Sequence, residues 1–239
     1  IHDNDLQVRL AALTAIAECR DVDAAATILQ QVDFDQPAER SAAAIAIGRT
    51  GYRNAVQELL SSLERVNDEV TRHSLVYALI DINDPRSLHA AIEQRKHERA
   101  LSDILIALDQ MPSGGLQREM VIPLASSDDP ALRKTALKII ASHPTWANGI
   151  DALVQRQMRQ LKSTEVDRAA LRGLLTVFIR DAAVQRDVGK ALLSERLEND
   201  QCEVVLSALG EVPSHDWPTS WRNGVRYYLK SSEDKLQFA

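Results

Sequence analysis

A repeat of apolar and small residues, 30 to 36 residues long, constrains the fold of this chain more than any other feature of its sequence. From an anchor at Val8, such residues stand four, five, seven and eight positions later. The template begins again at Glu39, Val70, Ala100, Leu132, Val166 and, in a weaker form, Cys202. Positions with these offsets share one face of an α-helix, so each copy predicts a helix with one buried stripe. In the copy that starts at Val70, for example, the stripe contains Ser74, Leu75, Tyr77 and Ala78.

The repeat predicts an all-α fold built from helical hairpins. The striped helices, which we call the second helices, are expected near 5–19, 36–48, 67–82, 97–110, 129–142, 164–180 and 200–211. First helices are expected between them, near 22–32, 53–65, 85–95, 115–125, 147–161, 182–197 and 219–229. Hairpins repeated at this period stack in sequence order, each covering the stripe of the next. We therefore predict a right-handed α-solenoid, or α-α superhelix, of about seven hairpins in a single domain over residues 1–239.

Composition agrees with a helical fold. Hydrophobic residues make up 45% of the chain and aromatic residues only 4%, and much of the apolar content is Ala, Leu, Ile and Val. A sheet fold would favour β-branched and aromatic residues and would need more turn residues than nine Gly and eight Pro.

Two short motifs resemble those of HEAT repeats, whose helical architecture is also described as armadillo-like. The range Asp84–Arg86 matches the opening of the first helix in that family, with a proline near its start. Asp5, Val8 and Arg9 match the opening of the second helix. Anchors that depart from the family's valine include Glu39, Ala100 and Cys202. The chain is most similar to the short bacterial repeats also found in phycobilin-lyase-like proteins.

This resemblance implies a shape more than an activity. Similar repeats occur in large bacterial proteins, some joined to a β-propeller dehydrogenase domain and a c-type haem domain. We expect the chain to be a fragment of such a multidomain protein, although it contains no dehydrogenase or haem residues. A cytoplasmic location is the default, and an extracytoplasmic one follows if the parent is such a fusion.

Charge and cysteine content exclude several partners. The chain carries 28 Lys/Arg and 34 Asp/Glu, a net charge of −6, and residues 1–120 alone carry 12 and 19. Binding to nucleic acid is driven by neutralisation of phosphates, so neither nucleic acid nor a membrane surface is expected as a partner.

Cys19 and Cys202 lie far apart without a CxxC motif, so no disulfide framework, zinc site or haem site is indicated.

Motifs for catalysis are missing from the sequence. HEAT-like hydroxylases hold two irons with several His–Glu pairs, whereas this chain has one, His97–Glu98, which we expect to be solvated in the first turn of a helix. There is no HExxH, GxSxG or P-loop motif. Trp217 and Trp221 are expected to cap the terminal core, and Trp146 to pack between repeats. We predict no catalytic, metal or cofactor-binding residues and no cofactor.

One cluster of basic residues is the candidate partner-binding site. Lys134 and Lys138 lie opposite the stripe of one second helix, and Arg168 and Arg172 occupy the equivalent positions of the repeat in the next copy. Stacked copies would join these side chains, with Arg133, into a basic patch for an acidic protein segment or a phosphate group. The alternative is a solvated helix face.

Earlier copies of the repeat carry apolar residues on the helix face opposite the stripe: Leu10, Ile45, Val76 and Ile106. This apolar row either packs against neighbouring helices or contacts another domain or a partner. The preferred function is a monomeric, non-catalytic scaffold or spacer that binds a protein or a neighbouring domain of the same chain. The alternative is a HEAT-like enzyme, either a DNA alkylpurine glycosylase or a chromophore lyase.

Overall fold

The computed structural model describes residues 3–30, 36–147, 149–159, 161, 165–193 and 199–227. Within those ranges the chain forms helices joined by short turns, and no strand occurs. Backbone contacts divide the chain into two compact units, Ile1–Gln117 and Arg118–Ala239. The predicted all-α class is confirmed, and the organisation of residues 1–239 as a single domain stays a prediction.

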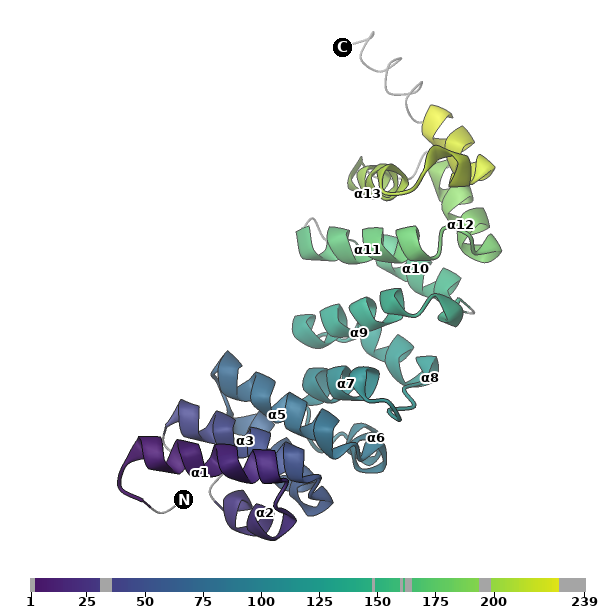
Figure 1. Ribbon diagram of the computed structural model, residues 1–239. Coiled ribbons are helices and arrows are strands. Elements are labelled where there is room, and N and C mark those ends of the chain that lie inside the picture. Colours follow the sequence, from purple (N-terminus) through teal and green to yellow (C-terminus); the bar gives the residue numbers. More distant parts are fainter. Residues whose placement is uncertain are drawn as a thin grey trace. The chain divides into compact units, whose positions relative to one another are not determined.

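Unit 1 is a stack of helical hairpins (Figure 1). Its helices are α1 (Leu6–Cys19), α2 (Val22–Leu29), α3 (Pro37–Thr50), α4 (Val56–Arg65), α5 (Glu69–Ile82), α6 (Pro85–Gln94) and α7 (Leu101–Gln110). The second helices α1, α3, α5 and α7 pack against one another in sequence order. Each first helix, α2, α4 or α6, packs against the second helix that follows it. The local arrangement is therefore that of a solenoid.

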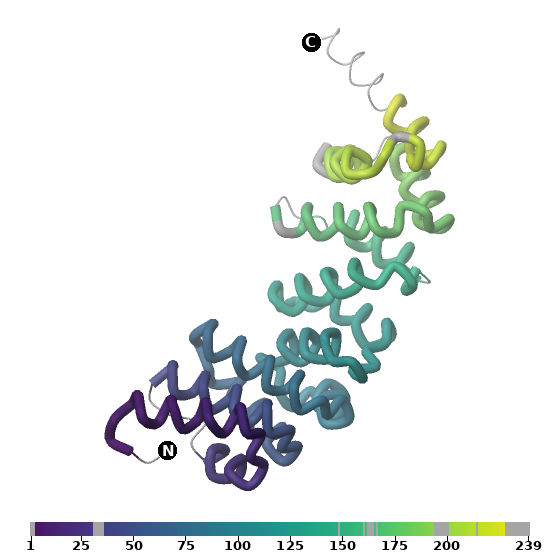
Figure 2. Tube along the Cα trace, in the orientation of Figure 1, coloured from purple at the N-terminus to yellow at the C-terminus, as the bar shows by residue number. Residues whose placement is uncertain are grey.

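Unit 2 repeats this arrangement, as the chain trace in Figure 2 shows. Its helices are α8 (Arg118–Val121), α9 (Pro130–Ser142), α10 (Ile150–Arg159), α11 (Glu165–Val177), α12 (Ala182–Leu192) and α13 (Asn199–Gly210), followed by a helix at 219–227. The second helices α9, α11 and α13 pack in order, and α10 packs against both α11 and α12.

The first helix expected near 115–125 is shorter than the others. It consists of α8 and a 3₁₀ turn over Ile122–Ser126. Pro123 has no N–H to donate to the α-helical ladder and sits in the first turn of the 3₁₀ segment. The proline therefore ends the α-helix after one turn.

Aspartate side chains start many of the helices. Their carboxylates accept hydrogen bonds from backbone N–H groups of the first turn, which otherwise have no partner in a helix. The residues that cap in this way are Asp5, Asp21, Asp68, Asp129 and Asp181. Prolines occupy the first turn of α3, α6 and α9, where their missing N–H costs nothing.

Most residues of the predicted stripes are buried. In α9, for example, Ala136, Leu137, Ile139 and Ile140 are all buried. Tyr77 of α5 is an exception, because it is 49% exposed although the template places it on the stripe. That prediction is wrong for Tyr77, because Tyr77 shares one face of α5 with Val70 and His73, which are also exposed.

Candidate functional site

Arginines of the second helices in unit 1 form ion pairs with carboxylates one repeat further along the chain. The pairs are Arg9–Glu39 at 2.5 Å, Arg40–Asp68 at 3.2 Å and Arg72–Asp103 at 2.5 Å. They join α1 to α3, α3 to the start of α5, and α5 to α7. Glu39 and Asp103 are buried, so water screens these two carboxylates little. We call this series of pairs the arginine ladder.

The ladder continues in unit 2, where it takes up three of the predicted partner-binding residues. The pairs are Arg133–Asp167 at 3.5 Å, Arg168–Glu203 at 3.6 Å and Arg172–Glu211 at 3.0 Å. Arg168 also lies 3.9 Å from Glu165 of its own helix. The guanidinium groups of the predicted basic patch thus face carboxylates of the same unit.

The two lysines of the predicted patch differ from the arginines. Lys134 and Lys138 are exposed on α9, one helical turn apart. Neither ammonium group lies within ion-pairing distance of a carboxylate of the described residues. Arg133 and Asp167 are 34 residues apart, the separation that also relates Lys134 to Arg168 and Lys138 to Arg172. The ion pair therefore supports the register from which the patch was predicted, and its role as a binding site stays a prediction.

Unit 1 carries an exposed apolar and aromatic surface on α3 and α5. Val70 is 69% exposed, Tyr77 is 49% exposed and Ile45 is 45% exposed. His73 lies between Val70 and Tyr77 on α5, and its ring packs edge-on against Tyr77 with centroids 4.6 Å apart. We call these four residues, Ile45, Val70, His73 and Tyr77, the unit 1 strip.

An ion pair links the two helices that carry the strip. Arg49 of α3 lies 3.6 Å from Asp81 of α5. Ile45 stands one turn before Arg49, and Tyr77 stands one turn before Asp81, so the ion pair lies one turn beyond these two residues of the strip.

The predicted apolar row is only partly exposed. Ile45 is exposed, Leu10 and Ile106 are half-buried, and Val76 is buried at 7% exposure. The template selects Val76 on α5, whereas the exposed face of this helix carries Val70, His73 and Tyr77. Val76 and Tyr77 are about 100° apart around the helix, so an error of one residue exchanges a buried side chain for an exposed one.

His97 does not lie in a solvated helical turn. It is only 7% exposed and sits in the turn before α7, which begins at Leu101, whereas Glu98 is exposed. The turn is held against α4, because the carboxylate of Glu64 accepts a hydrogen bond from the Ala100 N–H at 3.2 Å. The prediction of a solvated, helix-opening pair is therefore wrong for His97.

Metal-binding chemistry finds no support in the described part of the chain. No group of three or more His, Cys, Asp or Glu side chains in those ranges is arranged to hold a metal ion. Burial raises the pKa of the Cys202 thiol to about 11, which keeps it protonated and unreactive near neutral pH. No helix among the described residues is long and apolar enough to cross a bilayer.

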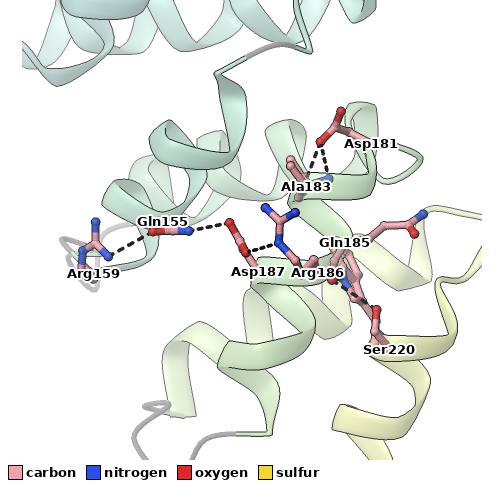
Figure 3. A network of polar contacts seen from close by, with 10 residues as sticks. Gln155, Arg159, Asp181, Ala183, Gln185, Arg186, Asp187 and Ser220 are labelled. Atoms are coloured by element: carbon pink, nitrogen blue, oxygen red, sulfur yellow. Dashed lines mark hydrogen bonds and ion pairs between the residues drawn. The ribbon is translucent and has the colours of Figure 1, made fainter.

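A polar network joins α10 and α12 in unit 2 (Figure 3). A cavity of about 380 Å³ lies beside this network. Gln155 Nε2 donates to Asp187 Oδ2 at 2.6 Å, and Arg186 Nε donates to Asp187 Oδ1 at 3.0 Å. The hydrogen bond from Arg186 lowers the pKa of Asp187. This carboxylate is therefore ionised and engaged by its neighbours, so it acts as a link between first helices and is not poised as a general base.

The tryptophans have structural positions. Trp221 is fully buried, and its Nε1 donates to the carbonyl oxygen of Gln185 at 3.0 Å, which confirms its place in the terminal core. Trp217 is half-buried and donates to the carbonyl oxygen of Val212. Trp146 is half-buried and stacks on His143, with ring centroids 4.2 Å apart.

Comparison with known protein families identifies the repeat. Residues 1–80 match the family model for HEAT repeats. The first third of the chain therefore consists of HEAT repeats. None of the curated proteins compared with the chain matches it. The chain is thus a helical-repeat scaffold, and within each unit the successive second helices pack together and are paired through the arginine ladder.

Sequence reasoning found the lysines of this HEAT-repeat scaffold but missed the carboxylates of the ladder. A signal was present, because each ladder arginine is followed by its acidic partner 28 to 39 residues later. The exposed aromatic ring of Tyr77 was missed because a periodic pattern predicts the exposed face of a helix from the repeat length. An error of one residue in that length selects the neighbouring side chain, here Val76.

Proposed function

We propose that this chain is a non-catalytic HEAT-repeat scaffold that binds a protein segment or a neighbouring domain on the exposed face of its second helices. The observation that supports this function is the set of exposed side chains left on that face after the helices have packed and the arginines have paired. In unit 1 these are the residues of the strip, and in unit 2 they are Lys134 and Lys138.

Exposed apolar side chains and unpaired charges contribute to binding when a partner removes them from water. A side chain such as Tyr77 offers a large apolar area at a low cost in conformational entropy. Lys134 and Lys138 offer charges that attract an acidic partner. In this proposal the repeats serve as an interaction or spacer module of a larger bacterial protein, in keeping with the family resemblance.

Site-specific photo-crosslinking tests the proposal. A photoreactive amino acid is placed at Tyr77 in α5 or Lys134 in α9, and, as matched controls, at the exposed first-helix positions Gln57 in α4 and Ala152 in α10. Covalent adducts with a protein of the source cell are expected at the second-helix positions. Adducts of equal yield at Gln57 and Ala152, or none at Tyr77 and Lys134, would contradict the proposal.

An enzyme of HEAT-like architecture remains the competing class. An alkylpurine glycosylase must grip duplex DNA through its phosphates, so its affinity falls steeply with salt. Duplex DNA that binds the chain at about 50 mM salt, with such a dependence, would favour the glycosylase. We expect no binding, because the chain is acidic and most arginines of the second helices are paired with carboxylates.

A further inference from the structure

On the second helices of unit 1, the charged side chains that remain once the ion pairs are set aside are acidic. Four arginines of α1, α3 and α5 each contact a carboxylate: Arg9, Arg40, Arg49 and Arg72. Glu18 of α1 and Glu69 of α5 are exposed, and neither is paired with a basic side chain among the described residues. Glu69 directly precedes Val70, so a free carboxylate borders the unit 1 strip.

Unit 1 as a whole reinforces this local charge. Its sequence, residues 1–117, contains 11 Lys/Arg and 18 Asp/Glu, a net charge of −7. Such a potential attracts basic partners and repels acidic ones over about one Debye length, which is about 8 Å at physiological salt. An acidic protein segment, a nucleic acid or an anionic lipid surface is disfavoured at this face.

The apolar part of the strip sets the second requirement on a partner. Val70 and Tyr77 are seven residues apart on α5, about 10 Å along its axis, and Ile45 extends the surface to α3. At the far end, Arg49 and Asp81 form an ion pair that is exposed on both sides, and such pairs are worth about 1 kcal/mol or less. A basic group of a partner can therefore compete with Arg49 for Asp81 at low cost.

We propose, resting on the function proposed above, that the unit 1 strip binds an amphipathic segment that combines apolar side chains with Lys or Arg. The apolar side chains cover Ile45, Val70 and Tyr77. The basic side chains pair with Glu69 and with Asp81 at the two ends of the strip. Recognition of this kind follows the mode in which an apolar helix face lies on a complementary surface and flanking charges set its orientation.

Helix α9 of unit 2 provides an internal control, because its exposed charges have the opposite sign. Lys134 and Lys138 would repel a basic segment and attract an acidic one. The inference thus assigns the basic amphipathic partner to α3 and α5 and not to α9.

Three synthetic peptides of about 18 residues, roughly five helical turns, serve as probes for the full chain. One is amphipathic with Leu and Lys, one with Leu and Glu, and one replaces every Leu of the first with Ser. We expect the Leu/Lys peptide to bind at about 0.15 M salt, and the other two to bind at least about tenfold more weakly. Hydrogen exchange should show that the bound peptide protects α3 and α5.

Substitutions then locate the site. Tyr77→Ser and Glu69→Lys should each weaken the Leu/Lys peptide by about tenfold or more, while Lys134→Glu combined with Lys138→Glu should not weaken it. All four side chains are exposed, so the variants should retain the far-UV circular dichroism and melting temperature of the parent. That check separates loss of binding from loss of fold.

Equal binding of the Leu/Glu peptide, or full binding by Tyr77→Ser and Glu69→Lys, would overturn the inference. So would protection confined to α9 and α11. If no probe binds while crosslinks still form at Lys134, the scaffold function stands and the assignment of a basic amphipathic partner fails. If crosslinks are also absent, the scaffold function fails as well.

Discussion

Gly48 of α3 lies directly against Ala78 of α5, so close that a β-carbon added at Gly48 would stand 2.7 Å from the Cα of Ala78. Real β-carbons do not approach backbone atoms to this distance, and the atom in the way belongs to a helix that cannot move alone. The absence of a side chain at Gly48 therefore sets the spacing of α3 and α5, the two helices that carry the unit 1 strip.

Gly48→Ala should destabilise the protein even though alanine is the better helix former. The added methyl group must push α5 away, and overpacking of this kind costs about 1 to 3 kcal/mol. Gly173→Ala in α11 is the matched control, because nothing lies within 4 Å of the added β-carbon. That change should stabilise the chain by up to about 1 kcal/mol. Thermal unfolding followed by circular dichroism measures both, and a Gly48→Ala variant as stable as the parent would contradict the close packing.

Ala136 tests the register of the repeat in unit 2. It is fully buried in α9, so Ala136→Arg forces a charge into a helix contact and should cost about 3 kcal/mol or more. Ala170 in α11 is half-buried, and Ala170→Arg should cost less because the long side chain can reach water. Ala152→Arg, at an exposed position in α10, should change the melting temperature little. Equal melting temperatures for all three variants would contradict the assignment of α9's buried face.

The helical class and the burial of most stripe residues could be predicted because they depend on offsets within one helix, where 3.6 residues per turn is fixed. The strip could not, because the side of α5 that stays exposed depends on the contacts of this helix with α3 and α7. Val76 and Tyr77 are adjacent in the sequence, yet the first is buried and the second is exposed.

The same limit applies to the candidate site. Lys134 and Lys138 could be recognised from one helix, and they are exposed as predicted. Arg168 pairs with Glu203 of α13, and Arg172 pairs with Glu211, which directly follows α13. These pairs depend on how α13 is positioned along α11, and no short sequence motif predicts that position. His97 was misjudged for a related reason, because the contact of its turn with α4 joins residues 36 positions apart.

Charge reversal should separate the lysines of the basic patch from its arginines. Lys134→Glu with Lys138→Glu removes no ion pair among the described residues, so stability should stay within about 0.5 kcal/mol of the parent. Arg168→Glu with Arg172→Glu places new carboxylates beside Glu203 and Glu211 and should lower the melting temperature further. Added salt should narrow the difference, because it screens exposed like charges. A lysine variant that loses more stability than the arginine variant would contradict the pairing described here.

Two carboxylates of the arginine ladder should affect the pH dependence of stability with opposite signs. Hydrogen bonds from Thr71, with a smaller effect of Arg40, lower the pKa of Asp68 in the folded state. Its contribution to stability is therefore present above the unfolded pKa, near 3.9, and is lost as the pH falls through the lower folded value. Burial raises the pKa of Asp103 despite the attraction of Arg72. Its contribution is present below the unfolded pKa and is lost as the pH rises through the folded value.

Asp68→Asn and Asp103→Asn, each of which removes one titration, separate these two effects. The free energy of unfolding is measured by urea titration between about pH 3 and pH 6, the range in which Asp side chains titrate. As the pH rises, the stability of the parent relative to Asp68→Asn should increase, whereas its stability relative to Asp103→Asn should decrease. Parallel curves for the parent and Asp103→Asn would contradict a raised pKa of Asp103 in the folded state. Because Asp103 joins α7 to Arg72 of α5, that result would mean that this ion pair stabilises the charged carboxylate as strongly as burial destabilises it.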